Sequence, residues 1–123
     1  MRTLQAKLLA MSDGAVTLTA PIGPTVSQQH GAAHAGLTFA LGDSAAGYAA
    51  LTQIAGDADV MTAEMKVNLL RPALGQRLIA EGRVIKSGRR LIVVQADVFA
   101  EEGDVRSHVA LIQGTMVPAE ATA

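Results

Sequence analysis

One carboxylate stands alone in a long stretch of small and apolar residues. Asp43 is the only Asp or Glu between Asp13 and Asp57, and its neighbours on both sides are otherwise typical of a protein core. Burying a carboxylate without a partner is costly. Asp43 therefore either points to solvent or pairs with a distant cation, or it lies in a cleft as a nucleophile or general base. The residue pattern alone leaves both interpretations open.

The segment before Asp43 contains two histidines and leads into helix-compatible residues. If a helix starts there, the backbone N–H groups of Ala35 and Gly36 should lie unpaired at its positive end, where they can hold an oxyanion or polarise a carbonyl. The plainer interpretation is a glycine-containing loop with a helix cap. His30 and His34 are four residues apart, but no spaced carboxylate or cysteine completes a metal ligand set, so we expect no metal.

A second candidate site is basic. Three of the ten Lys and Arg residues of the chain lie in one short segment, which consists of Lys86, Ser87, Gly88, Arg89 and Arg90. Arg71 precedes Pro72 at the end of a predicted strand. Basic turns are usually solvated, but this one would also suit a diphosphate or phosphomonoester, because Arg donates two parallel bonds to phosphate oxygens. The chain has no Walker or dinucleotide glycine fingerprint, so such a phosphate need not belong to ATP or NAD.

Turn chemistry and hydrophobic periodicity predict the elements that position these residues. The runs 4–11 and 15–22 flank Ser12-Asp13-Gly14, which predicts a hairpin. Helical spacing predicts a long helix over 35–55. After Asp59 the chain alternates with period two and predicts four strands. In the first of these, one face is expected to carry Met61, Ala63, Met65, Val67 and Leu69.

Two strands, one helix and four strands indicate an α+β fold, in which one mainly antiparallel sheet buries its apolar face on the long helix. The 123 residues suit a single domain, 1–123. Such a sheet leaves its edges and one flank of the helix uncovered, so we expect a homo-oligomer.

Composition narrows the function classes. The net charge of -1 provides no global field for nucleic acid or an anionic membrane, so we expect neither as a partner. The chain has no cysteine, which excludes disulfides and thiol nucleophiles. The N-terminus does not resemble a secretory signal, and the least charged stretch, 34–56, carries Asp43 in its middle. We therefore expect a cytoplasmic protein.

The segment from His34 to Ala49, HAGLTFALGDSAAGYA, resembles the signature of the hotdog-fold acyl-CoA thioesterases of the phenylacetate-degradation (PaaI-like) type. That signature is His-Gly-Gly followed by an Asp or Glu near the middle of the helix. The segment 63–73 is similar to the next strand of this family, and the turn 86–90 to its recurrent basic hairpin. The resemblance covers about residues 4–117.

The resemblance implies a hotdog fold, with a six-stranded mainly antiparallel sheet wrapped around one central helix. Two chains of such proteins pair into a continuous sheet, dimers often form tetramers, and the active sites lie between chains. The site residues that the resemblance implies are the carboxylate Asp43, the amides of Ala35 and Gly36 facing the thioester oxygen, the loop residue His34, and Gln28 and Thr62 placing the carbonyl or water. Ala35 and Gln28 depart from the Gly and Asn of many relatives.

These observations together predict hydrolysis of an acyl-CoA thioester, with coenzyme A as part of the substrate and no separate cofactor. Lys86, Arg89 and Arg90 would hold the phosphates, and Asp43 of a partner chain would activate water or attack directly. A non-catalytic acyl-CoA or acyl-carrier binding protein is the main alternative, and a hydratase a weaker one. The acyl group stays open, because Phe39, Tyr48, Met61 and Met65 fit an acyl pocket and a core equally well.

Overall fold

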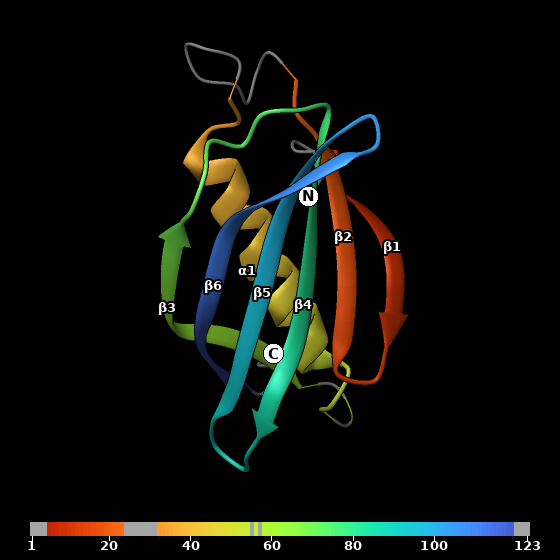
Figure 1. Ribbon diagram of the computed structural model, residues 1–123. Coiled ribbons are helices and arrows are strands. Elements are labelled where there is room, and N and C mark those ends of the chain that lie inside the picture. The colour runs from red at the N-terminus through yellow and green to blue at the C-terminus, as the bar shows by residue number, and fades with distance from the viewer. Residues whose placement is uncertain (1–4, 24–31, 55, 57, 120–123) are drawn as a thin grey trace.

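One helix and six strands make up the fold. The computed structural model describes residues 5–23, 32–54, 56 and 58–119. In chain order the elements are β1 (Lys7–Ser12), β2 (Ala15–Pro21), α1 (Ala35–Leu51), β3 (Asp59–Leu69), β4 (Arg77–Ser87), β5 (Ile92–Glu102) and β6 (Val105–Ala119). The strands form one antiparallel sheet in the order β1-β2-β4-β5-β6-β3, which curves around α1 (Figure 1). The predicted fold class and element order are confirmed.

The helix ends four residues earlier than its periodicity predicted, at Leu51. Thr52 explains this end. Its hydroxyl donates to the carbonyl of Ala49 at 2.6 Å and accepts from the N–H of Gly14 at 2.7 Å. Gly14 has a positive φ of 79° in the β1–β2 turn, where glycine is favoured. A contact between distant segments thus ends the helix.

Small residues let the helix approach the sheet very closely. Ala45, Ala46 and Ala49 are fully buried in α1. A Cβ added at Gly82 of β4 would clash with the backbone carbonyl of Ala45. The small side chains of the alanine-rich helix therefore allow its backbone to contact the backbone of the sheet at its centre.

A β-bulge divides β3 into two parts. Thr62 pairs with Met116 of β6, and Glu64 pairs with the preceding residue Thr115, so Ala63 is the extra residue. The prediction that one face runs without interruption from Met61 to Leu69 is therefore wrong. Thr62 faces α1, whereas Met61 is 59% exposed. The bulge reverses the alternation at this point in the strand.

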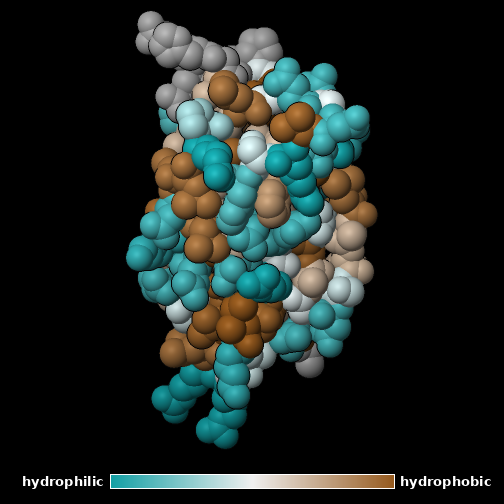
Figure 2. All heavy atoms as spheres, in the orientation of Figure 1, coloured by the Kyte–Doolittle hydropathy of each residue, from teal (hydrophilic) through white to brown (hydrophobic). Residues whose placement is uncertain are grey.

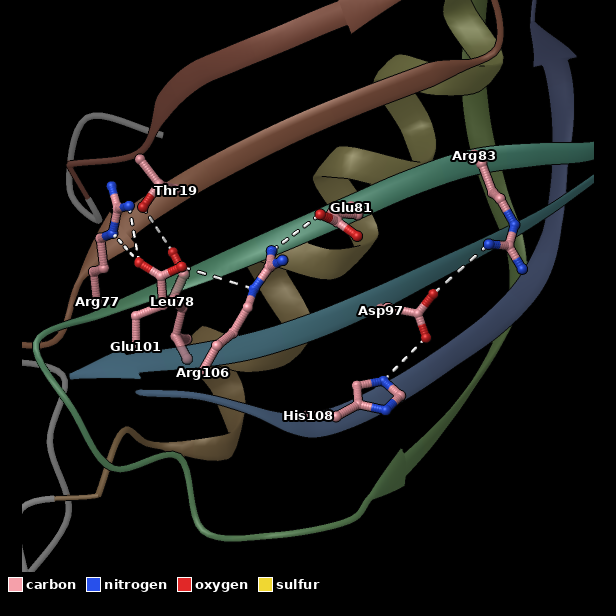
Figure 3. A network of polar contacts seen from close by, with 9 residues as sticks. All are labelled: Thr19, Arg77, Leu78, Glu81, Arg83, Asp97, Glu101, Arg106 and His108. Atoms are coloured by element: carbon pink, nitrogen blue, oxygen red, sulfur yellow. Dashed lines mark hydrogen bonds and ion pairs between the residues drawn. The ribbon is translucent and has the colours of Figure 1, made fainter. Parts of the chain in front are cut away.

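The outer face of the sheet carries charged residues that pair with each other (Figure 3). Arg77 contacts Glu101 at 2.9 Å, and Arg106 contacts Glu81 at 3.0 Å. The Arg106 guanidinium also lies 4.1 Å from the centroid of the Phe99 ring. These cations are engaged in contacts within the sheet.

Among the residues that the structure describes, no helix has the length and hydropathy needed to cross a membrane.

Candidate functional site

The side chains of Asp43 and Thr62 meet where the middle of α1 faces the edge strand β3. The Thr62 hydroxyl donates a 2.9 Å hydrogen bond to Oδ1 of Asp43 and lies 3.3 Å from the sulfur of Met116. Both residues line a cleft of about 170 Å³. Within the described part of the chain, Asp43 forms no ion pair. A half-buried carboxylate in a cleft, with a hydroxyl as its partner, matches the cleft interpretation of Asp43 better than the ion-pair interpretation.

Two local features open this cleft. The bulge at Ala63 turns Thr62 toward the helix. One turn after Asp43 comes Gly47, which contributes no side chain to the cleft and would meet only the terminal carbon of Met116, at 3.7 Å, if it carried a Cβ. The carboxylate therefore has open space beside it, lined by the same helix.

The start of α1 is capped by His34. Its Nδ1 accepts the Gly36 N–H at 2.9 Å, and its carbonyl accepts the N–H groups of Leu37 and Thr38. The Gly36 amide, expected to be unpaired, is thus occupied in this structure. The Ala35 N–H has no hydrogen bond to another described residue. Gln28 lies outside the described residues.

A second cleft, of about 650 Å³, lies at the start of the helix, and its lining includes Ala35, Thr38 and Arg71. Arg71 donates from Nη1 to the His108 carbonyl at 2.8 Å. The structure thus brings Arg71 near the helix start and not near the basic turn. This placement divides the predicted phosphate-binding residues into two groups.

The basic turn lies at the other end of the molecule. It joins β4 to β5, and the Gly88 N–H closes it by donating to the Leu91 carbonyl at 2.8 Å. Ser87 lines a shallow cleft with Thr52 and Gln53, which follow the end of α1. Hydrophilic side chains project at this end in Figure 2, where Figure 1 places the turn.

The cations of the turn differ from those of the outer sheet face in having no acidic partner. Lys86, Arg89 and Arg90 are exposed and form no ion pair with any described residue. Their charge is therefore available to an anion from solution.

The helix start and Asp43 cannot act together within one chain. Nine residues separate His34 from Asp43, which corresponds to about 13 Å along a helix. One carbonyl group cannot contact both. The described residues include no cluster of three or more side chains suited to hold a metal ion.

Comparison with known proteins identifies the family. Residues 30–107 match the model of the Thioesterase superfamily, and the chain belongs to this family. The resemblance to the hotdog-fold thioesterase family is confirmed, and the fold is shared with the PaaI protein of E. coli, which is 22% identical with a TM-score of 0.84 over 98% of this chain and 85% of that one.

Relatives agree with this assignment. The solved structure of a thioesterase family protein from Silicibacter pomeroyi is 36% identical, with a TM-score of 0.95 over 98% of this chain and 89% of that one. The BH2602 protein of Bacillus halodurans, solved with CoA, is 27% identical, with a TM-score of 0.77 over 83% and 66%. "Putative esterase SSO2140" of Saccharolobus solfataricus is 30% identical over 81% of this chain and 71% of its own.

Proposed function

We propose that this protein is an acyl-CoA thioesterase, which hydrolyses a coenzyme A thioester to the free acid and CoA. The observation that carries the proposal is the Asp43–Thr62 pair in a cleft of a Thioesterase superfamily fold. A carboxylate in such a place can take a proton from water or attack a carbonyl carbon.

Thr62 positions Asp43 for this role. It occupies Oδ1 through its hydrogen bond, which leaves Oδ2 for the attacking water or for direct attack. The positive end of a helix, with the Ala35 N–H, polarises the thioester carbonyl and stabilises the negative charge that develops on its oxygen.

Two copies of the chain complete the site. The distance along α1 prevents one copy from supplying both Asp43 and the helix start to one carbonyl, so the helix start comes from a partner. The edge strand β3, which carries Thr62, has one neighbour, β6, in the sheet. An unpaired strand edge is a ready surface for a second copy. A homo-oligomer is therefore part of this proposal.

The basic turn provides the site for the CoA phosphates. Lys86, Arg89 and Arg90 are exposed and form no ion pair with an acidic residue in the described part of the chain, and charge-assisted bonds to phosphate are among the stronger polar contacts. The related Bacillus halodurans protein was solved with CoA, which supports this class of ligand. Arg71, near the helix start, is a further candidate for a phosphate or carbonyl contact.

The test is thiol release from a panel of acyl-CoA thioesters by the wild-type protein, Asp43→Asn and Asp104→Asn. Asp104 lies in the exposed β5–β6 turn and serves as a matched control. Asp43→Asn should lower kcat by about a thousandfold or more and leave the oligomer and thermal unfolding unchanged, whereas Asp104→Asn should match the wild type. Protection against heat by acyl-CoA without any thiol release would instead indicate a non-catalytic binding protein.

A further inference from the structure

An apolar groove that the sequence did not reveal lies beside the helix. It has a volume of about 880 Å³, and its lining residues come from the β1–β2 hairpin and the C-terminal half of α1. Figure 1 shows where these elements lie. Val16 and Leu18 of β2 are buried in its lining, whereas Leu8 and Met11 of β1 are 56% and 65% exposed. The groove is therefore open to solvent along β1 and apolar inside.

This groove borders the Asp43 cleft. Tyr48 and Leu51 line both hollows, so the two adjoin at these residues in the C-terminal part of the helix. Tyr48 is 48% exposed and has no hydrogen bond from its hydroxyl to a described residue. To reach the groove from Asp43, a flexible ligand would pass Tyr48 on the exposed side of α1.

The volumes of the two hollows suit different parts of a substrate. The Asp43 cleft, at about 170 Å³, is smaller than ordinary small-molecule pockets, which occupy roughly 300–1,000 Å³. The groove, at about 880 Å³, falls within that range. The cleft thus suits the reacting carbonyl and a water molecule, and the groove suits the remainder of an apolar group.

The charges in the groove limit which group fits it. Its charged lining residues are Lys7, which begins β1, and Asp13, which follows the end of that strand, and the stretch between them contributes Leu8, Met11 and Ser12. An acyl group with a charge along its length would lose hydration there without gaining a partner. An uncharged aliphatic chain would instead gain from leaving water.

We propose that the groove binds the acyl chain of the substrate and makes the protein selective for uncharged aliphatic thioesters of medium length or longer over acetyl-sized ones. This inference rests on the proposed function, since it takes the thioester carbonyl to lie at Asp43. Tyr48 and Leu51 mark the passage between the site of hydrolysis and the chain-binding groove. Leu8 forms part of the wall on the side of β1.

The experiment compares Leu8→Trp with Leu9→Trp. Leu9 is its neighbour on β1, is similarly exposed at 50%, and does not line the groove. Binding is measured by calorimetry with S-alkyl-CoA thioethers of increasing chain length, and hydrolysis with the matching acyl-CoA thioesters. For the wild type, affinity should rise about fourfold with each added methylene that is buried. Leu8→Trp should lower both the affinity for long-chain S-alkyl-CoA thioethers and kcat/KM for long-chain thioesters at least tenfold. Its kcat/KM for acetyl-CoA should stay unchanged, and Leu9→Trp should equal the wild type in every measurement.

The outcomes separate this inference from the proposed function. If every thioester is hydrolysed at a rate independent of chain length, or if both tryptophan variants lose long-chain affinity equally, the groove is not the chain site, although the protein is still a thioesterase. If the alkyl-CoA compounds bind with the predicted length dependence and no thioester is hydrolysed, the groove assignment stands and the enzymatic function fails. If no alkyl-CoA binds at all, both are wrong. Thermal unfolding of both variants checks that β1 has kept its fold.

Discussion

The Thr62 hydroxyl donates a 2.9 Å hydrogen bond to Oδ1 of Asp43 and so connects the edge strand of the sheet to the middle of the helix. The bond depends on the bulge at Ala63, which turns Thr62 toward α1. The strand edge, the bulge and the carboxylate therefore form one unit. We therefore expect a change in any one of the three to alter the rate of thioester hydrolysis.

We expect Thr62→Ala to lower kcat by about tenfold to a hundredfold with little change in KM. Hydrogen bonds to charged groups contribute about 1.5–3 kcal/mol, which corresponds to that range of rates. Thr62→Ser keeps the hydroxyl and should restore most of the activity. Steady-state kinetics on one acyl-CoA substrate measures both variants. Equal losses in the two would show that the hydroxyl is not what matters at this position.

Replacing the cap residue His34 tests the helix start. Its Nδ1 accepts the Gly36 N–H, and loss of a capping acceptor costs about 1 kcal/mol. His34→Ala should therefore lower the free energy of unfolding by about that amount in a urea titration. His34→Asn provides another acceptor and should lose less. An Asn variant as unstable as the Ala variant would contradict the capping role.

The double substitution Arg89→Ala/Arg90→Ala should raise KM for a CoA thioester by about tenfold, the loss expected for one charge-assisted contact. The KM for the matching N-acetylcysteamine thioester, which has no phosphate, should stay the same. Added salt should weaken CoA-thioester binding to the wild type more than to the double variant. Arg83→Ala is the matched control, since Arg83 lies near Asp97, at 3.9 Å. A rise in KM for both kinds of thioester would exclude phosphate binding by the turn.

The contact between Gly82 and Ala45 can be tested by adding one methyl group. A Cβ at position 82 meets backbone atoms of the helix, and backbone cannot move aside as a flexible side chain can. Gly82→Ala should therefore lower the free energy of unfolding by about 3 kcal/mol or more. The new carbon of Gly23→Ala would meet no atom of a described residue within 4 Å, and this variant should change stability by about 0.5 kcal/mol or less. Denaturant titrations of the two variants give the comparison.

Local signals predicted most of the fold. The Asp13-Gly14 turn and the alternation after Asp59 are readable in short windows, and the strands lie where these signals placed them. The end of α1 and the bulge in β3 could not be predicted in this way. Thr52 ends the helix together with Gly14, which lies 38 residues away. Gly114 of β6 leaves room for the bulge, because a Cβ there would meet the backbone of Glu64.

The candidate site was predictable in part. The isolation of Asp43 left a structural and a functional interpretation open, and the family resemblance implied the functional one, with Thr62 as a companion. The meeting of the two in one cleft is seen only in three dimensions. Occupation of the Gly36 N–H by the ring of His34 was not predicted, because histidine is not among the residues preferred at an N-cap. The apolar groove was missed because its lining comes from β1, β2 and α1 together.

The close backbone contact between Ala45 and Gly82 also limits which substitutions this protein can accept. Because the backbones touch there, space for a bulkier substrate cannot be made beneath the centre of the helix without unseating it. Room can be added only along the rim, chiefly in the first hairpin. A library that randomises the exposed positions of β1 is thus the most direct route to new substrate preferences. The buried face of the helix at its middle has little room for larger side chains.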